Sequence, residues 1–243
     1  MTGAGPLRVL VVVPALNEAR SVGGVVDEIR RAVPTADVLV VDDGSTDRTA
    51  DAARDAGALV VRLPYNLGVG GAMRTGFRYA ARSGYDAVVQ IDADGQHDPA
   101  YVPAVLAALG HADVVVGARF AGVGDYAVRG PRSWAMKVLS RVVGRLVGAP
   151  LTDVTSGFRA ANRRALGVFA LHYPAEYLGD TVESLVIARR SGLRIVQVPV
   201  AMRVRAHGVP SQRLFGSMTY LARASVALGL ALVRQWPIPE EHS

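Results

Sequence analysis

Short apolar segments alternate with longer helix-like segments along the first half of the chain. The short segments are rich in β-branched residues and apolar throughout, which is typical of strands buried on both faces of a sheet. The predicted strands are Arg8–Val13, Asp37–Val41, Ala58–Leu63, Ala87–Ile91 and Asp113–Val116. The predicted helices are Ala19–Val33, Thr46–Ala56 with Ser45 or Thr46 as its N-cap, Val69–Ser83 and Pro99–Leu109. This order predicts an α/β domain with a parallel central sheet and helices on both faces.

The second half has a less regular pattern. It predicts a glycine-rich loop over Gly117–Gly130, a helix over Pro131–Val147, a loop or edge segment over Leu151–Arg159, a helix over Thr181–Ser191, a strand within Leu193–Arg205 and a helix over Gln212–Arg234. No linker, internal repeat or low-complexity stretch divides the chain. We therefore expect one domain over residues 1–211, followed by a C-terminal helix and tail over residues 212–243.

Polar residues gather where the predicted strands end, and ligands of parallel sheets bind beyond those carboxyl ends. The segment Asp92-Ala93-Asp94-Gly95-Gln96 follows the fourth strand. Two carboxylates two residues apart, with the neutral carbonyl of Gln96 within reach, can present oxygens to one hard cation such as Mg²⁺ or Mn²⁺. The alternative is a solvated acidic turn, because an isolated Asp-x-Asp is common.

Three further loops have weaker individual signals. Residues 14–18 follow the first strand, and their proline turn, amide and acid can shape a nucleoside pocket. Residues 42–47 place carboxylates where a ribose or base edge could be held, although acids at a helix N-terminus are favourable in any case. The glycines of residues 66–72 would let a helix N-terminus approach an anion, with tight helix–sheet packing as the alternative. Only the combination of these loops points to a nucleotide.

Together and in this order, the four loops resemble those of the family 2 glycosyltransferases, which have the Rossmann-like nucleotide-diphospho-sugar transferase (GT-A) fold. The resemblance extends over residues 7–205. Within the family, the segments Asp92–Pro99, Gly117–Phe120 and Asp153–Arg159 resemble the polyprenol-phosphate sugar transferases of the dolichol-phosphate mannose synthase group. The resemblance implies an inverting enzyme that moves a sugar from a UDP- or GDP-linked donor to an acceptor, with a polyprenyl phosphate as the first candidate.

The resemblance also implies roles for individual residues. By this resemblance, Asp92, Asp94 and Gln96 bind the metal, Asp92 and Asp94 are catalytic, and Arg119 contacts a phosphate. It places the nucleotide sugar against Pro14, Leu16, Asn17, Glu18, Asp42, Asp43, Asn66, Gly71 and Ala93.

Charge is distributed unevenly within the total of +6. Residues 1–118 carry 10 Arg against 14 acids, whereas residues 119–213 carry 15 basic residues against 5 acids. This segregation suggests a metal site first and an anion-binding region second. A phosphate acceptor is already an anion near neutral pH, so it needs cations rather than a base. We expect these cations among Arg119, Arg129, Arg132, Arg203 and Arg205, with some of the five as surface bystanders.

A hydroxyl acceptor would instead need a general base, for which Asp153 is the candidate. The alternative role of Asp153 is to orient the turn at residues 155–157. The histidines 97, 111, 172 and 207 have no metal-ligand spacing with one another and are interpreted as structural or surface residues. Three acids, Glu176, Asp180 and Glu183, precede or begin a predicted helix, and we interpret them as capping it rather than lining the acceptor entrance.

The sequence leaves three alternatives to a polyprenyl-phosphate sugar transferase. A soluble transferase acting on a sugar or small-molecule hydroxyl is the first alternative. A nucleotidyltransferase shares the fold but usually carries a glycine-rich basic loop after the first strand, where this chain has Pro14–Glu18. A nucleic-acid binder would fit the charge but not the aromatic content of 6%, so we expect no nucleic acid partner.

The segment Leu214–Val233 is long enough to span a membrane, but Arg223 lies near its centre. We expect it to bind the membrane surface peripherally, beside a polyprenyl phosphate; the alternatives are packing on its own domain, on a second copy of the chain or on a membrane-protein partner. The chain contains no cysteine, and Met1–Leu7 lacks the features of a signal peptide. We therefore expect a cytoplasmic protein.

Overall fold

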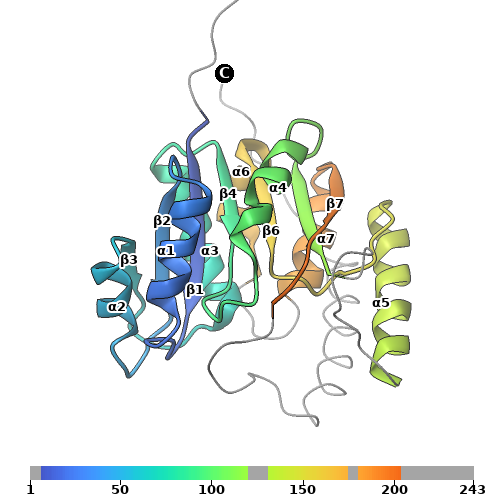
Figure 1. Ribbon diagram of the computed structural model, residues 1–243. Helices are drawn as coiled ribbons and strands as arrows, with labels where there is room; N and C mark the ends of the chain where they lie inside the picture. The colour runs from blue at the N-terminus through green and yellow to red at the C-terminus, as the bar shows by residue number, and fades with distance from the viewer. Residues whose placement is uncertain (1–6, 120–130, 175–179, 204–243) are drawn as a thin grey trace, which may run out of the picture.

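The computed structural model describes residues 7–119, 131–174 and 180–203, and only the backbone of residues 131–137. Its strands form one seven-stranded sheet in the order β3-β2-β1-β4-β6-β5-β7 (Figure 1). These strands are β1 (Val9–Ala15), β2 (Asp37–Asp42), β3 (Leu59–Arg62), β4 (Ala87–Gln90), β5 (Val114–Ala118), β6 (Arg159–Asn162) and β7 (Ile195–Pro199). All neighbouring strands are parallel except β6, which is antiparallel to both β4 and β5.

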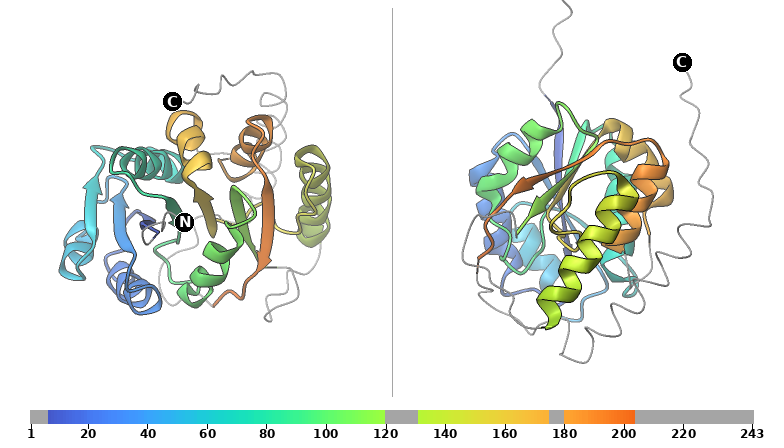
Figure 2. Two further views of the ribbon diagram at one scale, coloured as in Figure 1. Left: turned by 90° about the horizontal axis from the view of Figure 1, so that it is seen from above. Right: turned by 90° about the vertical axis from the view of Figure 1, so that its right-hand side faces the viewer.

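Helices cover both faces of this sheet (Figure 2). One face carries α1 (Val22–Ala32), α2 (Thr49–Asp55) and α4 (Val102–Ala108), the last preceded by a 3₁₀ turn at Pro99–Tyr101. The other carries α3 (Gly68–Arg82), α6 (Arg163–His172) and α7 (Asp180–Arg190), with α5 (Pro131–Val147) packed against α7. Alternate residues of β1 enter the two cores, Val9, Val11 and Val13 on one side and Leu10 and Val12 on the other, because side chains of a strand alternate between faces.

The predicted α/β architecture is confirmed, with three local differences. Helix α2 begins at Thr49, so Ser45 and Thr46 as N-caps were wrong; the Asp47 carboxylate accepts the Thr49 N–H at 3.0 Å. The predicted loop or edge segment Leu151–Arg159 leads into β6, which lies inside the sheet. Strand β6 has the sequence Arg-Ala-Ala-Asn, without the β-branched residues that identify the other strands. The following helix α6 was also missed.

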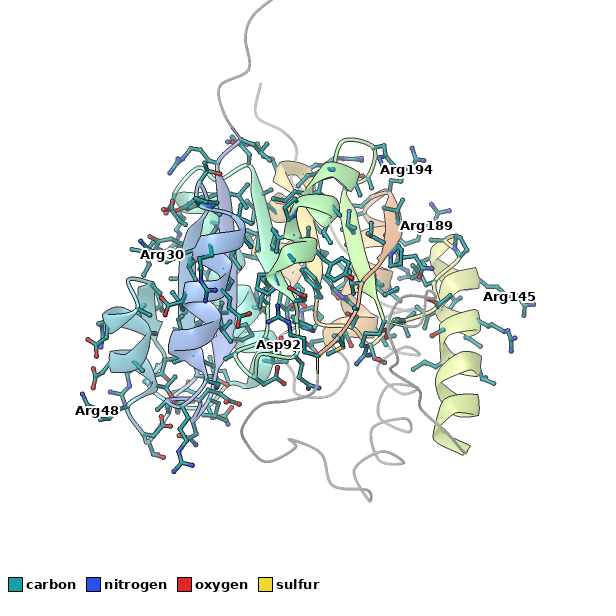
Figure 3. The ribbon with its side chains drawn as sticks, in the orientation of Figure 1. Arg30, Arg48, Asp92, Arg145, Arg189 and Arg194 are labelled. Carbon is teal, nitrogen blue, oxygen red and sulfur yellow. The ribbon has the colours of Figure 1, made fainter. Side chains whose placement is uncertain are left out.

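The carboxyl ends of the parallel strands meet at one edge of the sheet, and antiparallel β6 begins at that edge. Asp92, just beyond β4, lies there, whereas Arg194, just before β7, lies at the opposite edge (Figure 3). No helix among the described residues is both long and apolar enough to cross a membrane. The segment Leu214–Val233 lies outside those residues.

Candidate active site

The Asp92 side chain is surrounded on three sides at the end of β4. Gln90 Nε2 donates a hydrogen bond to Asp92 Oδ1 at 3.2 Å. The backbone of Gly157 lies so close that a Cβ at that position would stand 3.0 Å from Asp92 Oδ2. His97 provides the third side, with Nδ1 accepting the Asp92 N–H at 3.1 Å and Nε2 at 3.7 Å from Oδ2. The Asp92 side chain is still 36% exposed, so its carboxylate can reach a ligand.

Asp94 and Gln96 lie in the same turn. Asp94 is buried, and its Oδ1 accepts the Gln96 N–H at 2.9 Å. Gly95 between them has a φ of 75°, a left-handed conformation that favours glycine. The turn therefore holds two carboxylates and one amide within a few residues.

This set of side chains fits a divalent metal that is shared with the substrate. No cluster of three or more His, Asp or Glu side chains in the described parts of the chain could enclose a metal alone. Asp92, Asp94 and Gln96 carry side-chain oxygens of the kind that Mg²⁺ and Mn²⁺ prefer. Mg²⁺ in particular is usually bound by one or two carboxylates together with substrate phosphates and water. In a site of that kind, substrate phosphates and water would supply the remaining ligands.

The second pair of aspartates follows β2 and has a different arrangement. Asp43 accepts the backbone N–H groups of Leu67 at 2.7 Å and Gly68 at 2.8 Å, so its carboxylate occupies the N-terminus of α3. Burial raises the pKa of Asp43, and these two hydrogen bonds oppose the rise. Asn66 Oδ1 also accepts the Gly68 N–H. The amides that were expected to approach an anion are thus occupied by the chain itself.

The glycines of this loop serve close packing. A Cβ on Gly70 would lie 2.4 Å from the carbonyl oxygen of Pro174, and one on Gly71 would lie 2.5 Å from Leu67 Cβ. The structure therefore shows close packing at Gly70 and Gly71, both buried, whereas the contact of Gly71 with a nucleotide stays a prediction.

Asp42 retains an unused acceptor. Its Oδ1 accepts the Ser45 N–H at 2.9 Å, whereas Oδ2 is buried without a hydrogen bond, 3.4 Å from Arg62 Nε. A buried oxygen without a donor is costly unless a ligand supplies one. Arg62 was missed by the sequence reasoning, although a cation that ends an apolar strand is a usable signal.

The turn after β1 is tied to the loop after β2. Asn17 has a φ of 56°; its N–H donates to Ser45 Oγ and its Oδ1 accepts the Thr46 N–H, each at 2.9 Å. Glu18 donates its N–H to Thr49 Oγ1 and accepts from Ser21 Oγ. Leu16 is half-buried, whereas Pro14 and Ala93 are buried. The structure thus brings the predicted loops 14–18 and 42–47 together, and the backbone N–H and side chain of Asn17 join them.

Asp153 forms a buried ion pair with Arg119. Arg119 Nε donates to Asp153 Oδ2 at 2.5 Å and Nη2 donates to Oδ1 at 2.8 Å. Burial alone would raise the pKa of Asp153, but the hydrogen bonds and charge of Arg119 outweigh it and hold the pKa below its ordinary value. Asp153 Oδ1 also accepts from the N–H and hydroxyl of Thr155. This geometry favours the turn-orienting role of Asp153 over that of a base.

Arg203 follows β7 and contacts the turn at residues 92–96. Its N–H donates to the Gln96 carbonyl at 2.9 Å, and its guanidinium pairs with Glu28 and, at 2.8 Å, with Asp98. Arg129, Arg205 and the side chain of Arg132 lie outside the described residues. Of the five predicted phosphate-binding cations, the structure thus describes two, and each contacts an acid.

The sequence pattern of glycosyl transferase family 2 matches residues 10–169. The chain is 37% identical over 215 residues to an undecaprenyl-phosphate mannosyltransferase of Micrococcus luteus, covering 83% of this chain and 86% of that protein. It is 31% identical to a polyprenol monophosphomannose synthase of Mycolicibacterium smegmatis, covering 83% and 80%. The chain belongs to the family 2 glycosyltransferases.

The fold of this glycosyltransferase is that of a solved relative. Glucosyl-3-phosphoglycerate synthase of Mycobacterium tuberculosis, in complex with Mn²⁺, UDP-glucose and phosphoglyceric acid, superimposes with a TM-score of 0.71 at 27% identity, covering 97% of this chain and 82% of that one. The expected GT-A fold and the enzyme class are confirmed.

The glycosyltransferase also contains a buried polar cluster behind the turn at residues 92–96. Arg159, at the start of β6, donates to the carbonyl oxygens of Ser156, Val154 and Thr181 and to Ser184 Oγ, at 2.7 to 2.9 Å. Burial raises the pKa of Asp180 to about 6, against the opposing charge of Arg159. Asp180 is the first residue of α7, and its buried Oδ2 has no hydrogen-bond partner. It lies with Glu183 in the first turn of α7, which agrees with the predicted capping role, although Asp180 is buried; Glu176 lies outside the described residues.

Proposed function

We propose that this glycosyltransferase transfers a sugar, with inversion, from a nucleoside-diphosphate donor to a polyprenyl phosphate. Asp92 and Asp94, with Gln96, would hold Mg²⁺ or Mn²⁺. The observation that carries the proposal is this carboxylate pair at the carboxyl edge of the sheet. The relatives from Micrococcus luteus and Mycolicibacterium smegmatis support the acceptor class by their names.

The metal, when bound, neutralises the charge that develops on the diphosphate as the nucleotide leaves. The chain itself supplies the rest of the donor site. Asp42 Oδ2, buried and without a hydrogen bond, would accept an N–H of the base or an O–H of the ribose. The joined loops at residues 14–18 and 42–47 would form the wall of that pocket.

The acceptor side requires cations more than a base. A phosphate monoester has its second pKa near about 6, so it is already a nucleophile at neutral pH. The lowered pKa of Asp153 makes it a weak base and suits it to positioning Arg119. We assign phosphate binding to Arg119 and Arg203, together with Arg129, Arg132 and Arg205.

The test is transfer of labelled sugar to an extractable lipid. Radiolabelled GDP-mannose and UDP-glucose are each incubated with Mn²⁺ and polyprenyl phosphate, and the products are partitioned into organic solvent. We expect label in the organic phase that depends on both lipid and metal. A labelled product that stays in water would indicate a hydroxyl acceptor. Pyrophosphate release from a nucleoside triphosphate and a sugar phosphate would indicate a nucleotidyltransferase.

We also propose that residues 212–243 bind the cytoplasmic membrane surface, where the phosphate of such a lipid lies. Flotation with anionic liposomes compares the whole chain with a chain ending at Ser211. The whole chain should float at low salt and the shortened one should not. If both proteins sediment equally, the membrane proposal is wrong. A soluble acceptor would then be favoured, and the partner of residues 212–243 would be a second copy of the chain or a membrane protein.

A further inference from the structure

His97 is buried in the wall of the metal-binding turn. It is 4% exposed, and its ring stacks on Phe158 with centroids 5.3 Å apart and planes inclined by 24°. Its backbone pairs with Met202, on the segment that follows β7. Phe158 is itself fully buried. These contacts fix the plane of the imidazole before any ligand arrives.

Both ring nitrogens of His97 face one residue, Asp92. Nδ1 accepts the Asp92 N–H at 3.1 Å, so Nδ1 carries no proton and the neutral ring must carry its proton on Nε2. Nε2 lies 3.7 Å from Asp92 Oδ2. This distance is too long for a hydrogen bond, so the Nε2–H acts on the carboxylate electrostatically. The same ring therefore lies against both the backbone N–H and the carboxylate of Asp92.

Packing alone does not account for this arrangement. An aromatic hydrocarbon ring would fill the space on Phe158 without burying two polar nitrogens. Gln90 Nε2 approaches Asp92 Oδ1 from the other side, at 3.2 Å, so the two oxygens of the carboxylate face different donors. Groups that orient a ligating carboxylate are worth about 10- to 100-fold in metal affinity or activity.

We propose that His97 is a positioning residue that sets the orientation of Asp92 for metal binding. This inference rests on the proposed function, because Asp92 must be a metal ligand for its orientation to matter. His97 acts through Asp92 and does not itself contact the metal or the substrate.

The tautomer of His97 is the first test, and it needs neither metal nor activity. Long-range ¹H–¹⁵N correlation spectra of the ¹⁵N-histidine protein at about pH 8, where free imidazole is neutral, should show the His97 proton on Nε2. The His97→Phe variant assigns the signal, since it alone lacks it. A proton on Nδ1 would overturn the proposal, because that nitrogen could not accept the Asp92 N–H.

Metal affinity is the second test. Free Mn²⁺ is measured by electron paramagnetic resonance in titrations with Mn²⁺ alone and with UDP or GDP added. His97→Phe keeps the ring stacked on Phe158 and loses both nitrogens, so we expect the dissociation constant for Mn²⁺ to rise about 10- to 100-fold. His97→Asn keeps an acceptor for the Asp92 N–H, so its loss should be smaller. His111→Phe, at an exposed histidine, is the control and should match the wild type.

The outcomes separate this inference from the proposed function. If the wild type binds Mn²⁺ and a folded His97→Phe protein binds it equally well, His97 only packs, and the proposal is overturned. If the wild type binds no Mn²⁺ with either nucleotide, the metal site itself is wrong and His97 has nothing to position. Thermal unfolding of each variant shows whether the measured protein is folded, and a lowered melting temperature with unchanged Mn²⁺ affinity would likewise assign His97 to packing.

Discussion

Two pairs of aspartates follow buried strands of the same sheet, yet their surroundings differ. Asp42 and Asp43 are adjacent, and successive residues of an extended chain point to opposite sides. Asp43 accordingly caps α3, whereas Asp42 lies beside Arg62. Asp92 and Asp94 are separated by one residue in a tight turn, and Asp92 is the more exposed.

The spacing accounts for the difference in surroundings. In extended chain the adjacent carboxylates of Asp42 and Asp43 point to different sides, and Asp43 is used to cap α3. A pair with one residue between them can serve a common ion. Changes at the two pairs should therefore have different consequences, one for metal-dependent catalysis and the other for stability and nucleotide binding.

The largest effect is expected from Asp94→Asn. Asparagine keeps an acceptor for the Gln96 N–H and removes the charge that would bind the metal. A bound metal contributes several kcal/mol to transition-state stabilisation, so kcat should fall about 1,000-fold or more. Steady-state rates across a Mn²⁺ titration measure it. Turnover that keeps the wild-type Mn²⁺ dependence would remove Asp94 from the metal site.

Asp180→Asn tests a carboxylate outside both pairs, buried behind the turn at residues 92–96. The pKa of Asp180 is about 6 in the folded protein against an ordinary value of 3.8. The folded state therefore holds more protons than the unfolded state between these values, and stability falls as the pH rises through this window. Above about pH 6 the variant should be more stable than the wild type, by up to about 3 kcal/mol. Near pH 4 the wild type and Asp180→Asn should have nearly equal free energies of unfolding.

Denaturant unfolding at a series of pH values measures this difference. Asp86→Asn is the matched control, since the Arg8 N–H and Arg163 hold the pKa of Asp86 below its ordinary value. Ionised Asp86 stabilises the fold at pH values above its ordinary pKa, and this stabilisation is lost as the pH falls. Asp86→Asn should therefore be less stable than the wild type at neutral pH, the opposite of the result expected for Asp180→Asn. A difference for Asp180→Asn that does not vary with pH would show that its carboxyl is not selectively protonated in the fold.

Asp43→Ala should destabilise the fold and spare the metal site. The change leaves the N–H groups of Leu67 and Gly68 without their acceptor at the start of α3. Loss of a helix cap costs up to about 2 kcal/mol in the free energy of unfolding. Asp42→Asn is its counterpart, because it should leave stability closer to the wild type and weaken nucleotide binding. If Asp42→Asn and the wild type bind the nucleotide equally well, Asp42 does not contact the base or the ribose of the nucleotide.

Much of the fold was predictable because its first half consists of strands buried on both faces. Runs such as Val9–Val13 leave little choice but a central parallel strand. Strand β6 could not be recognised, because its four residues enter the sheet through pairing with β4 and β5 rather than through their own preference. The position of the turn at residues 92–96 was predictable for the same reason as the first half, because it follows a strand whose place is fixed; its metal-binding role stays a prediction.

The surroundings of the predicted residues were less predictable. Which of two neighbouring aspartates caps a helix depends on where α3 begins, a tertiary fact that the spacing does not contain. Gln90 had a readable signal, since a polar residue in a buried strand needs a partner. His97 had none, because its contacts with Asp92 and Phe158 arise only when the turn folds against β6.

The smallest effect is expected from Arg62→Gln. This variant tests whether nucleotide binding beside Asp42 depends on the neighbouring cation. Arg62 Nε lies 3.4 Å from Asp42 Oδ2, and Arg62 Nη2 donates to the Ser45 carbonyl at 2.9 Å. Without this cation the pocket gains net negative charge beside an anionic nucleotide. The Arg62 side chain is 58% exposed, so solvent screens the interaction to about 1 kcal/mol or less.

Isothermal titration with UDP and GDP should therefore show a dissociation constant raised by no more than about fivefold, the equivalent of 1 kcal/mol. The rise should shrink at high salt, because ions screen exposed charges. Arg48→Gln is the control: its side chain is 83% exposed and its Nε pairs with Asp51 on α2 (Figure 3). If both variants weaken nucleotide binding equally, the effect is one of net charge alone, and Arg62 has no particular connection with Asp42. If only Arg62→Gln weakens nucleotide binding, the nucleotide lies beside Asp42, after β2, whereas the proposed metal lies beside Asp92, after β4.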